Sequence, residues 1–244
     1  MPVAILEKIG HALIGGIVSC LSPPRCRLCQ APLFDHASPY LCQACAAGVE
    51  WIGEGACRKC GFPAGPGARL GQGCSRCRRL DLGLTAVAAT TRYRHGARSL
   101  VLALKFRGET SIARPMASLM AERFRNFGFG AIDWIVPASL HPERRRARGF
   151  DQSSLLGRHL AGEIDILLRE DLLRRVRHTR PQSSLTRFGR LENARGAFTA
   201  SPGIAGGRIL LVDDVMTTGA TLRDCARACR EAGATRVYAL VFAR

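Results

Sequence analysis

The pattern of apolar and polar positions changes character along the chain. From about residue 84, short apolar runs alternate with segments in which apolar residues recur every three or four positions. The runs predict strands over 84–93, 133–137, 172–176, 209–215 and 236–242, and the periodic segments predict helices over 97–106, 112–127, 151–161 and 222–232. Strands that alternate with helices are typical of a parallel sheet with helices on both faces. We therefore expect an α/β domain over residues 83–244, with its ligand at the carboxyl ends of the strands.

The first residues repeat apolar side chains at helical spacing, as at Leu6, Ile9, Leu13 and Ile17. This predicts an amphipathic helix over 1–22 that packs on the body of the protein or on a partner. Charged residues interrupt the segment, which disfavours a secretory signal. The chain has no apolar run of about 18 residues, so we expect no membrane span.

Cysteine is concentrated between these two parts. Eight of the 11 cysteines form four Cys-x-x-Cys pairs within 52 residues. Two such pairs, joined by a short hairpin, make a tetrahedral zinc site. The pairs therefore predict a small double zinc ribbon over 23–82 that holds two structural Zn²⁺ ions. The simplest grouping is sequential, with Cys26, Cys29, Cys42 and Cys45 on one ion and Cys57, Cys60, Cys74 and Cys77 on the other.

Three other readings of these cysteines stay open. An interleaved grouping of the pairs would also give two sites. Disulfides would suit a secreted chain, and iron–sulfur clusters favour other spacings. The segment is rich in turn-forming residues and poor in core residues, so a metal would supply much of its folding energy.

The chain is strongly basic. The formal net charge is +17, and nearly all of the positive charge is arginine, because lysine occurs only at positions 8, 59 and 105. This balance indicates anionic partners such as nucleic acid or phosphates, although a general bias toward arginine would give the same count. The ribbon shares this basic character, so it either has a structural or protein-docking role or contacts nucleic acid directly.

The most specific segment is 209–222. An apolar run ends in Asp213 and Asp214 and leads, through a short loop, into a helical pattern. Backbone N–H groups are unpaired at a helix start, and the helix dipole favours an anion there. The loop residues therefore predict a phosphate site, whereas two carboxylates would repel phosphate and suit vicinal hydroxyls or a Mg²⁺-bound group. The implied ligand is a sugar phosphate held by Asp213, Asp214, Thr217, Thr218, Gly219, Ala220 and Thr221.

This segment resembles the PRPP-binding motif of type I phosphoribosyltransferases. The resemblance implies PRPP with Mg²⁺ as ligand, Asp213 and Asp214 on the ribose hydroxyls, and residues 217–221 around the 5′-phosphate. The alternative without a ligand is an ordinary strand end that carries two solvated acidic side chains. A Walker B strand would need a partner Gly-x-x-x-x-Gly-Lys-Ser/Thr loop, and a dinucleotide fold would need Gly-x-Gly-x-x-Gly after a strand. The sequence contains neither motif.

Further basic segments fit the same resemblance. The loop after strand 133–137 precedes a run of arginines, and such a loop holds pyrophosphate in a phosphoribosyltransferase. The polar segment 174–198 fits a hood over the nucleobase end, which closes to exclude water. Each of these side chains could instead belong to a solvated basic face with no ligand. The candidates for pyrophosphate or hood contacts are Lys105, Arg144, Arg145, Arg148, Arg177 and Gln182.

Taken together, the four cysteine pairs and the segments LKFRG (104–108), RGFDQ (148–152), TRPQ (179–182) and VDDVMTTG (212–219) are similar to the ComF family. These are competence-associated, phosphoribosyltransferase-like proteins with an N-terminal double zinc ribbon. Residues 137–139 depart mildly from the expected pattern, which would have a second proline or an apolar residue.

The ComF resemblance implies a cytosolic bacterial protein linked to DNA uptake, with single-stranded DNA and a helicase-type protein as partners. Two hypotheses stay open. The first is a phosphoribosyltransferase, and the second is a non-catalytic accessory module that binds single-stranded DNA or a helicase partner through the zinc ribbons and basic surface. A regulatory protein that senses PRPP without turnover lies between them.

Overall fold

The computed structural model describes residues 24–33, 40–65, 73–75, 77, 81–177 and 195–244. The chain divides into two compact units, Met1–Val49 and Glu50–Arg244. This division falls between the second and third cysteine pairs, so the last two pairs share a unit with the α/β segment. The predicted sequence domains, 1–22, 23–82 and 83–244, stay a prediction, and the expected first helix lies outside the described residues.

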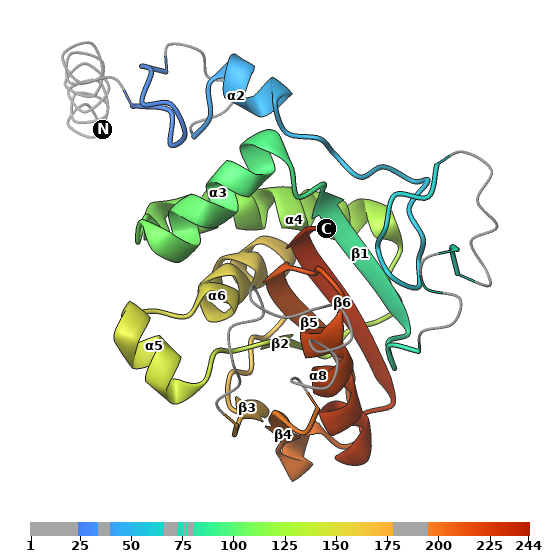
Figure 1. The fold of residues 1–244 in the computed structure, drawn as a ribbon. Coiled ribbons are helices and arrows are strands. Elements are labelled where there is room, and N and C mark those ends of the chain that lie inside the picture. The colour runs from blue at the N-terminus through green and yellow to red at the C-terminus, as the bar shows by residue number, and fades with distance from the viewer. Residues whose placement is uncertain (1–23, 34–39, 66–72, 76, 78–80, 178–194) are drawn as a thin grey trace, which may run out of the picture. The chain divides into compact units, whose positions relative to one another are not determined.

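A parallel four-stranded sheet in the order β1-β6-β5-β2 forms the centre of the larger unit (Figure 1). Its register sets Val212 of β5 beside Pro137 of β2 and Leu240 of β6, which places the carboxyl ends of these strands at one edge. The sheet confirms the predicted α/β class. Its strands are β1 (Ala86–Thr91), β2 (Trp134–Pro137), β5 (Arg208–Val215) and β6 (Arg236–Ala243).

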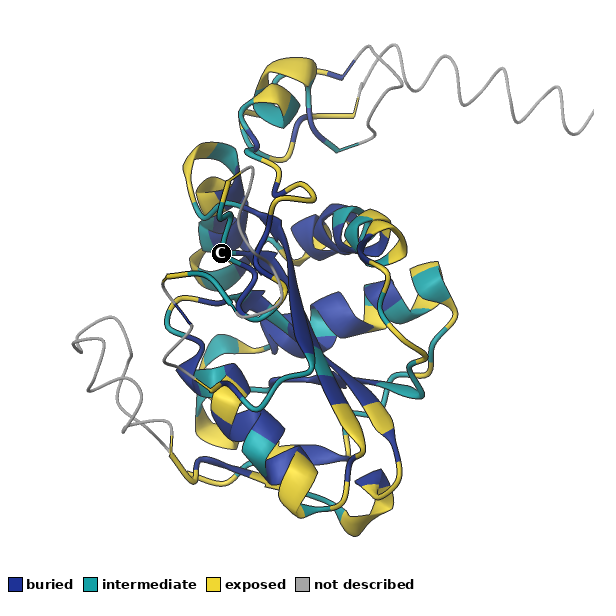
Figure 2. Ribbon diagram, turned by 90° about the vertical axis from the view of Figure 1, so that its right-hand side faces the viewer, coloured by how far each residue is buried: buried dark blue, intermediate teal, exposed yellow. Residues whose placement is uncertain are grey.

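Helices cover both faces of this sheet. Helices α4 (Ala113–Phe127) and α6 (Gln152–Ile164) pack on one face, and α8 (Ala220–Glu231) packs on the other (Figure 1). The strands are therefore almost wholly buried (Figure 2), as expected for parallel strands covered on both sides. The remaining helical elements are α2 (Gln43–Ala47), α3 (His95–Phe106), η1 (Thr110–Ile112), α5 (Pro142–Arg148) and η3 (Pro202–Ile204).

The structure corrects one strand prediction. The segment predicted as a strand over 172–176 does not join the parallel sheet. Its β3 (Leu173–Arg175) pairs antiparallel with β4 (Phe198–Ala200) in a separate two-stranded sheet. A parallel strand covered on both faces needs apolar side chains throughout, and two of the three residues of β3 are arginines.

The basic run that follows the loop after β2, for which the sequence predicted no secondary structure, is the helix α5. Pro142 occupies its first turn, and His141 caps it by accepting a hydrogen bond from the Glu143 N–H at 3.4 Å. Proline at this position costs no hydrogen bond, because the first N–H groups of a helix have no partner within the helix. Gly149, with φ of 85°, ends the helix.

Over the stretches that the structure describes, no helix combines the length and the apolar character needed to cross a membrane.

Candidate functional site

The acid pair lies where β5 ends. Asp213 is half-buried, and its Oδ1 accepts hydrogen bonds from Ser153 Oγ and from the Asp214 N–H, both at 2.9 Å. Burial raises the pKa of Asp213 to about 7, and the neighbouring charge of Asp214 acts in the same direction. The Asp213 carboxyl is therefore poised to change its protonation state near neutral pH.

Asp214 is paired with the lysine predicted from the sequence. The Nζ of Lys105, in the last turn of α3, lies 2.7 Å from Asp214 Oδ2. Burial by itself would lower the Lys105 pKa, but the adjacent Asp214 carboxylate raises it above its usual value. Lys105 is thus held as a cation against the acid pair.

Arginines from two elements surround this pair. Burial lowers the pKa of Arg148 while the charge of Asp214 opposes that effect, and burial lowers the pKa of Arg175 while Asp213 opposes it. Arg144 repels both guanidinium groups, so it lies close to them. Helix α5 and strand β3 therefore direct positive charge toward the end of β5.

The loop after the acid pair leads directly into α8. Gly219 is the N-cap of α8 with φ of 83°, and the Ala220 N–H donates to Thr218 Oγ1 at 3.3 Å. A Cβ on Gly219 would lie 2.6 Å from Met216 Cε and 3.0 Å from a Leu82 methyl. Only glycine fits this conformation and this space, so the chain builds a compact loop at a helix start, where an anion is favoured.

The loop after β2 is fixed beside it. The Ala138 N–H donates to the Val212 carbonyl at 2.9 Å. Buried Asp151, the N-cap of α6, accepts hydrogen bonds from the Leu140 N–H at 2.5 Å and from the Ser154 N–H at 3.0 Å. This loop is the one expected to hold pyrophosphate, and Asp151 fastens it to α6.

Three predicted residues remain. Arg145 lines a hollow of about 730 Å³ together with Leu140 of the loop after β2 and with Arg175 of β3. Arg177 donates to the Arg195 carbonyl at 2.7 Å, so it joins the two ends of segment 178–194. Gln182 lies outside the described residues.

Sequence analysis did not predict Ser153. A signal was present, because four consecutive polar residues, 151–154, stand at the start of the predicted helix, and all four are buried in the structure.

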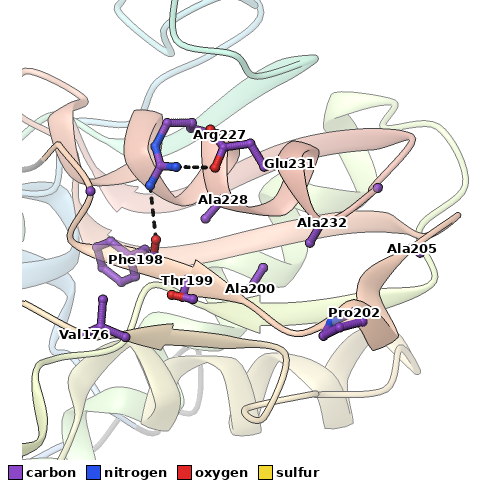
Figure 3. A pocket seen from close by; sticks show the side chains of 12 residues that line it. Val176, Phe198, Thr199, Ala200, Pro202, Ala205, Arg227, Ala228, Glu231 and Ala232 are labelled. Atoms are coloured by element: carbon purple, nitrogen blue, oxygen red, sulfur yellow. Dashed lines mark hydrogen bonds and ion pairs between the residues drawn. The ribbon is translucent and has the colours of Figure 1, made fainter.

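A second hollow, of about 800 Å³, lies between α8 and β4 (Figure 3). Val176, Phe198 and Ala228 line it, and Arg227 crosses its upper side by donating to the Phe198 carbonyl at 3.1 Å and pairing with Glu231. None of the predicted site residues within the described ranges contributes to its lining. The hollow is therefore distinct from the acid pair.

The eight paired cysteines gather in two tetrads in sequence order, Cys26, Cys29, Cys42 and Cys45, and then Cys57, Cys60, Cys74 and Cys77. Within each tetrad the sulfur atoms lie within 4.8 Å of one another, and the Cys57–Cys77 and Cys60–Cys74 pairs are 3.6 Å apart. Tetrahedral zinc with Zn–S bonds of about 2.3 Å places its ligands about 3.8 Å apart, whereas a disulfide needs about 2.05 Å. The two tetrads therefore fit structural zinc in the sequential grouping.

The second tetrad is part of the core of the larger unit. Cys57, Cys60 and Cys77 are buried in one apolar cluster with Val87 and Ala89 of β1. The Val87 N–H donates to the Arg58 carbonyl at 2.7 Å. This cysteine turn thus covers the outer edge of the sheet along β1 (Figure 1).

Comparison with known proteins agrees with this architecture. The double zinc ribbon domain family matches residues 17–78, and the phosphoribosyl transferase domain family matches residues 151–244. The DNA utilization protein YhgH of Salmonella typhi is 31% identical over 220 residues, covering 88% of this chain and 94% of that protein. Competence protein F of Haemophilus influenzae is 26% identical over 227 residues, covering 90% and 96%. The chain belongs to the ComF family.

A third ComF relative is the competence protein ComFC of Streptococcus pneumoniae, which is 30% identical over 203 residues and covers 81% of this chain and 84% of that protein. Among solved structures, the glutamine phosphoribosylpyrophosphate amidotransferase of B. subtilis is 21% identical with a TM-score of 0.37. That match spans 54% of this chain and 26% of the solved chain.

Proposed function

We propose that this ComF protein binds PRPP, or a related ribose phosphate, together with Mg²⁺ at the end of β5. One observation carries the proposal: the loop that ends at Gly219, the N-cap of α8, directly follows the acid pair at the end of β5. The loop suits a phosphate and the acids suit hydroxyl groups, so both ends of a ribose phosphate have partners within a few residues.

The contacts in the structure refine the roles of the basic residues. Lys105 is engaged with Asp214, so we assign it to holding that carboxylate in place for the ribose hydroxyls. Arg148 on α5 interacts with the charge of Asp214, and Arg144 lies close to Arg148. The guanidinium groups of both arginines suit the oxygen atoms of pyrophosphate. Residues 217–221 surround the 5′-phosphate in this arrangement.

The donor set also suits Mg²⁺. This ion prefers carboxylate oxygens and substrate phosphates and keeps several of its waters, and Asp213 offers a half-buried carboxylate. When bound, Mg²⁺ would offset the negative charge of the pyrophosphate. The chain itself would hold ribose and pyrophosphate in line and neutralise the leaving group. These two effects account for the rate enhancement in such a transfer.

Binding is tested by calorimetry with PRPP and Mg²⁺ on the zinc-replete chain. Asp213→Asn should weaken binding about 10–100-fold, because it removes a charged hydrogen-bond acceptor, and the Asp213→Asn/Asp214→Asn double variant should abolish it. Asp133→Asn is the matched control, since Asp133 pairs with Arg208 at the start of β5. Retained affinity in a folded double variant would refute the proposal.

Turnover needs a separate test. The nucleophile is not identified by any residue of the site, so nucleobases should be screened for release of pyrophosphate from PRPP. Release that depends on an added base would establish a phosphoribosyltransferase. Tight PRPP binding without release of pyrophosphate would indicate a sensor of PRPP.

We keep one alternative, a non-catalytic module that binds single-stranded DNA or a helicase partner through its ribbons and basic surface. The net charge of +17 favours it, and relatives bear the names DNA utilization protein and competence protein. The alternative predicts single-strand binding that weakens steeply with salt, and loss of partner binding when the ribbons are removed.

The reduced cysteine tetrads suit a reducing compartment, so we place the protein in the cytoplasm.

A further inference from the structure

The side chain of Arg244 joins two loops that are far apart in the sequence. Its Nε donates to the Cys60 carbonyl at 2.9 Å, and its Nη1 donates to the Met216 carbonyl at 2.9 Å and also to the Thr217 carbonyl. Cys60 belongs to the second cysteine tetrad. Met216 and Thr217 begin the loop that we assign to the 5′-phosphate. One guanidinium group therefore connects the tetrad to that loop.

Arg244 is itself firmly placed. Its N–H donates to the Thr91 carbonyl and its carbonyl accepts from the Tyr93 N–H, both at 2.9 Å. The guanidinium carbon lies 5.9 Å from the centre of the Phe62 ring, next to the tetrad. With the backbone bound on both sides, the side chain has little freedom to leave the two loops. A guanidinium presents several donors in one rigid plane, which a lysine ammonium does not.

The consequence for the loop follows from peptide geometry. In a trans peptide the C=O and the next N–H point in opposite directions across one plane. When Arg244 holds the Met216 and Thr217 carbonyls, it also sets the directions of the Thr217 and Thr218 N–H groups. Those N–H groups then point away from the arginine, and they are the donors that an anion in this loop needs.

The tetrad side of this connection is equally fixed. A Cβ on Gly61 would lie 3.1 Å from Val87 and 3.3 Å from Ala89, so the turn after Cys60 packs closely on β1. Leu82, which follows the tetrad, is buried and lies against Gly219 of the loop. Four thiolates bound to one metal would hold the Cys60 carbonyl in position, and without metal the four side chains would take up protons and lose this common bond.

We infer that Arg244 is a positioning residue for the phosphate loop, and that the metal state of the Cys57, Cys60, Cys74 and Cys77 tetrad controls the order of that loop through the Cys60 carbonyl. The first part concerns the loop itself, and its effect on ligand binding rests on the proposed function. The second cysteine tetrad then supports the ligand site directly.

Hydrogen exchange on the Met216 and Ala220 amides, which donate to the Ala243 carbonyl and to Thr218 Oγ1, tests the inference without a ligand. Arg244→Met should speed their exchange at least about tenfold, because the hydrogen bonds that hold the loop carbonyls are lost. Arg244→Lys should restore part of the protection. Arg208→Met is the control, since Arg208 makes a bidentate pair with Asp133 at the start of β5 and should leave the loop unchanged.

A pair of cysteine variants tests the metal connection. Cys74→Ala and Cys45→Ala should each remove about one zinc per chain, but only Cys74→Ala should speed exchange in the loop. Cys45 belongs to the tetrad in the other compact unit. Equal effects of the two cysteine variants, or loop exchange in Arg244→Met that matches the wild type, would overturn the inference.

Ligand binding supplies a selective readout. Arg244→Met should weaken ribose 5-phosphate about tenfold and leave Mg²⁺-pyrophosphate within about twofold, because the arginines of α5 are untouched. A general loss of structure would weaken both probes, and equal weakening counts against the inference. If the wild type binds neither probe, the proposed function fails, while hydrogen exchange still decides the role of Arg244.

Discussion

Replacing Lys105 with methionine tests whether the acid pair depends on a buried cation. The Lys105 Nζ lies 2.7 Å from Asp214 Oδ2, and the two side chains are 25% and 5% exposed. Methionine fills a similar volume without charge. The Lys105→Met variant would therefore leave Asp214 buried beside Asp213 without its ion-pair partner.

The expected cost follows from burial. Removal of one partner from a fully buried ion pair costs about 3–5 kcal/mol. Lys105 is a quarter exposed, so water compensates part of the loss, and we expect about 2–3 kcal/mol for Lys105→Met. Asp214→Asn in the Lys105→Met background should recover much of this cost, because no unpaired charge then remains.

Urea denaturation in zinc-containing buffer measures these differences. Both tryptophans, Trp51 and Trp134, lie in the larger unit, so fluorescence reports on the unit that carries the site. A double-mutant cycle over the two positions should give a coupling energy above about 1 kcal/mol. A Lys105→Met cost below about 0.5 kcal/mol, or additive single effects, would refute the reasoning.

Four further predictions concern the same unit and the tetrads. The pKa of Asp213 in the folded protein, about 7, exceeds its ordinary value of 3.8. The contribution of Asp213 to the free energy of unfolding is therefore full below about pH 4 and is lost as the pH rises through 7. Asp213→Asn should flatten this dependence of the unfolding free energy on pH, as measured by denaturation at several pH values, and an unchanged dependence would contradict the assignment. Ribose 5-phosphate binding should tighten from pH 6 to pH 8, because the ionised Asp213 carboxylate accepts hydrogen bonds from the ribose hydroxyl groups. Gly219→Ala should cost about 1–3 kcal/mol and weaken phosphate binding, whereas Gly206→Ala, with φ of 76° and open space, should cost stability alone. Metal analysis should find two zinc ions per chain, and one would contradict the second tetrad.

The parts of the site encoded by local pattern were predictable. An apolar strand, two acids, a glycine and a helical period follow one another within residues 209–222, and each signal refers to its near neighbours. The structure places the strand, the Gly219 turn and α8 in this order. The cysteine tetrads were predictable for the same reason, because a two-residue spacing brings each pair of sulfurs together.

The parts that depend on distant segments were not predictable. Arg244 is 184 residues from Cys60 in sequence, and no period or spacing connects them. Ser153 meets Asp213 only because α6 packs against β5. The strand predicted over 172–176 forms as β3, but its place in the parallel sheet was wrong for a related reason, since its pairing depends on β4, which follows more than 20 residues later.

The chemistry of the acid pair separates the two functional hypotheses in space. Asp213 and Asp214 repel a phosphodiester backbone, and the raised pKa of Asp213 shows that the local environment already disfavours more negative charge. A ligand with hydroxyl groups beside one phosphate suits the site, whereas our alternative proposal places single-stranded DNA on the basic surface elsewhere. Asp213→Asn should therefore weaken ribose 5-phosphate while leaving single-strand affinity and its salt slope unchanged. If filter binding at several salt concentrations shows that Asp213→Asn weakens single-strand binding, the acid pair itself contacts nucleic acid, and the separation into two surfaces is wrong.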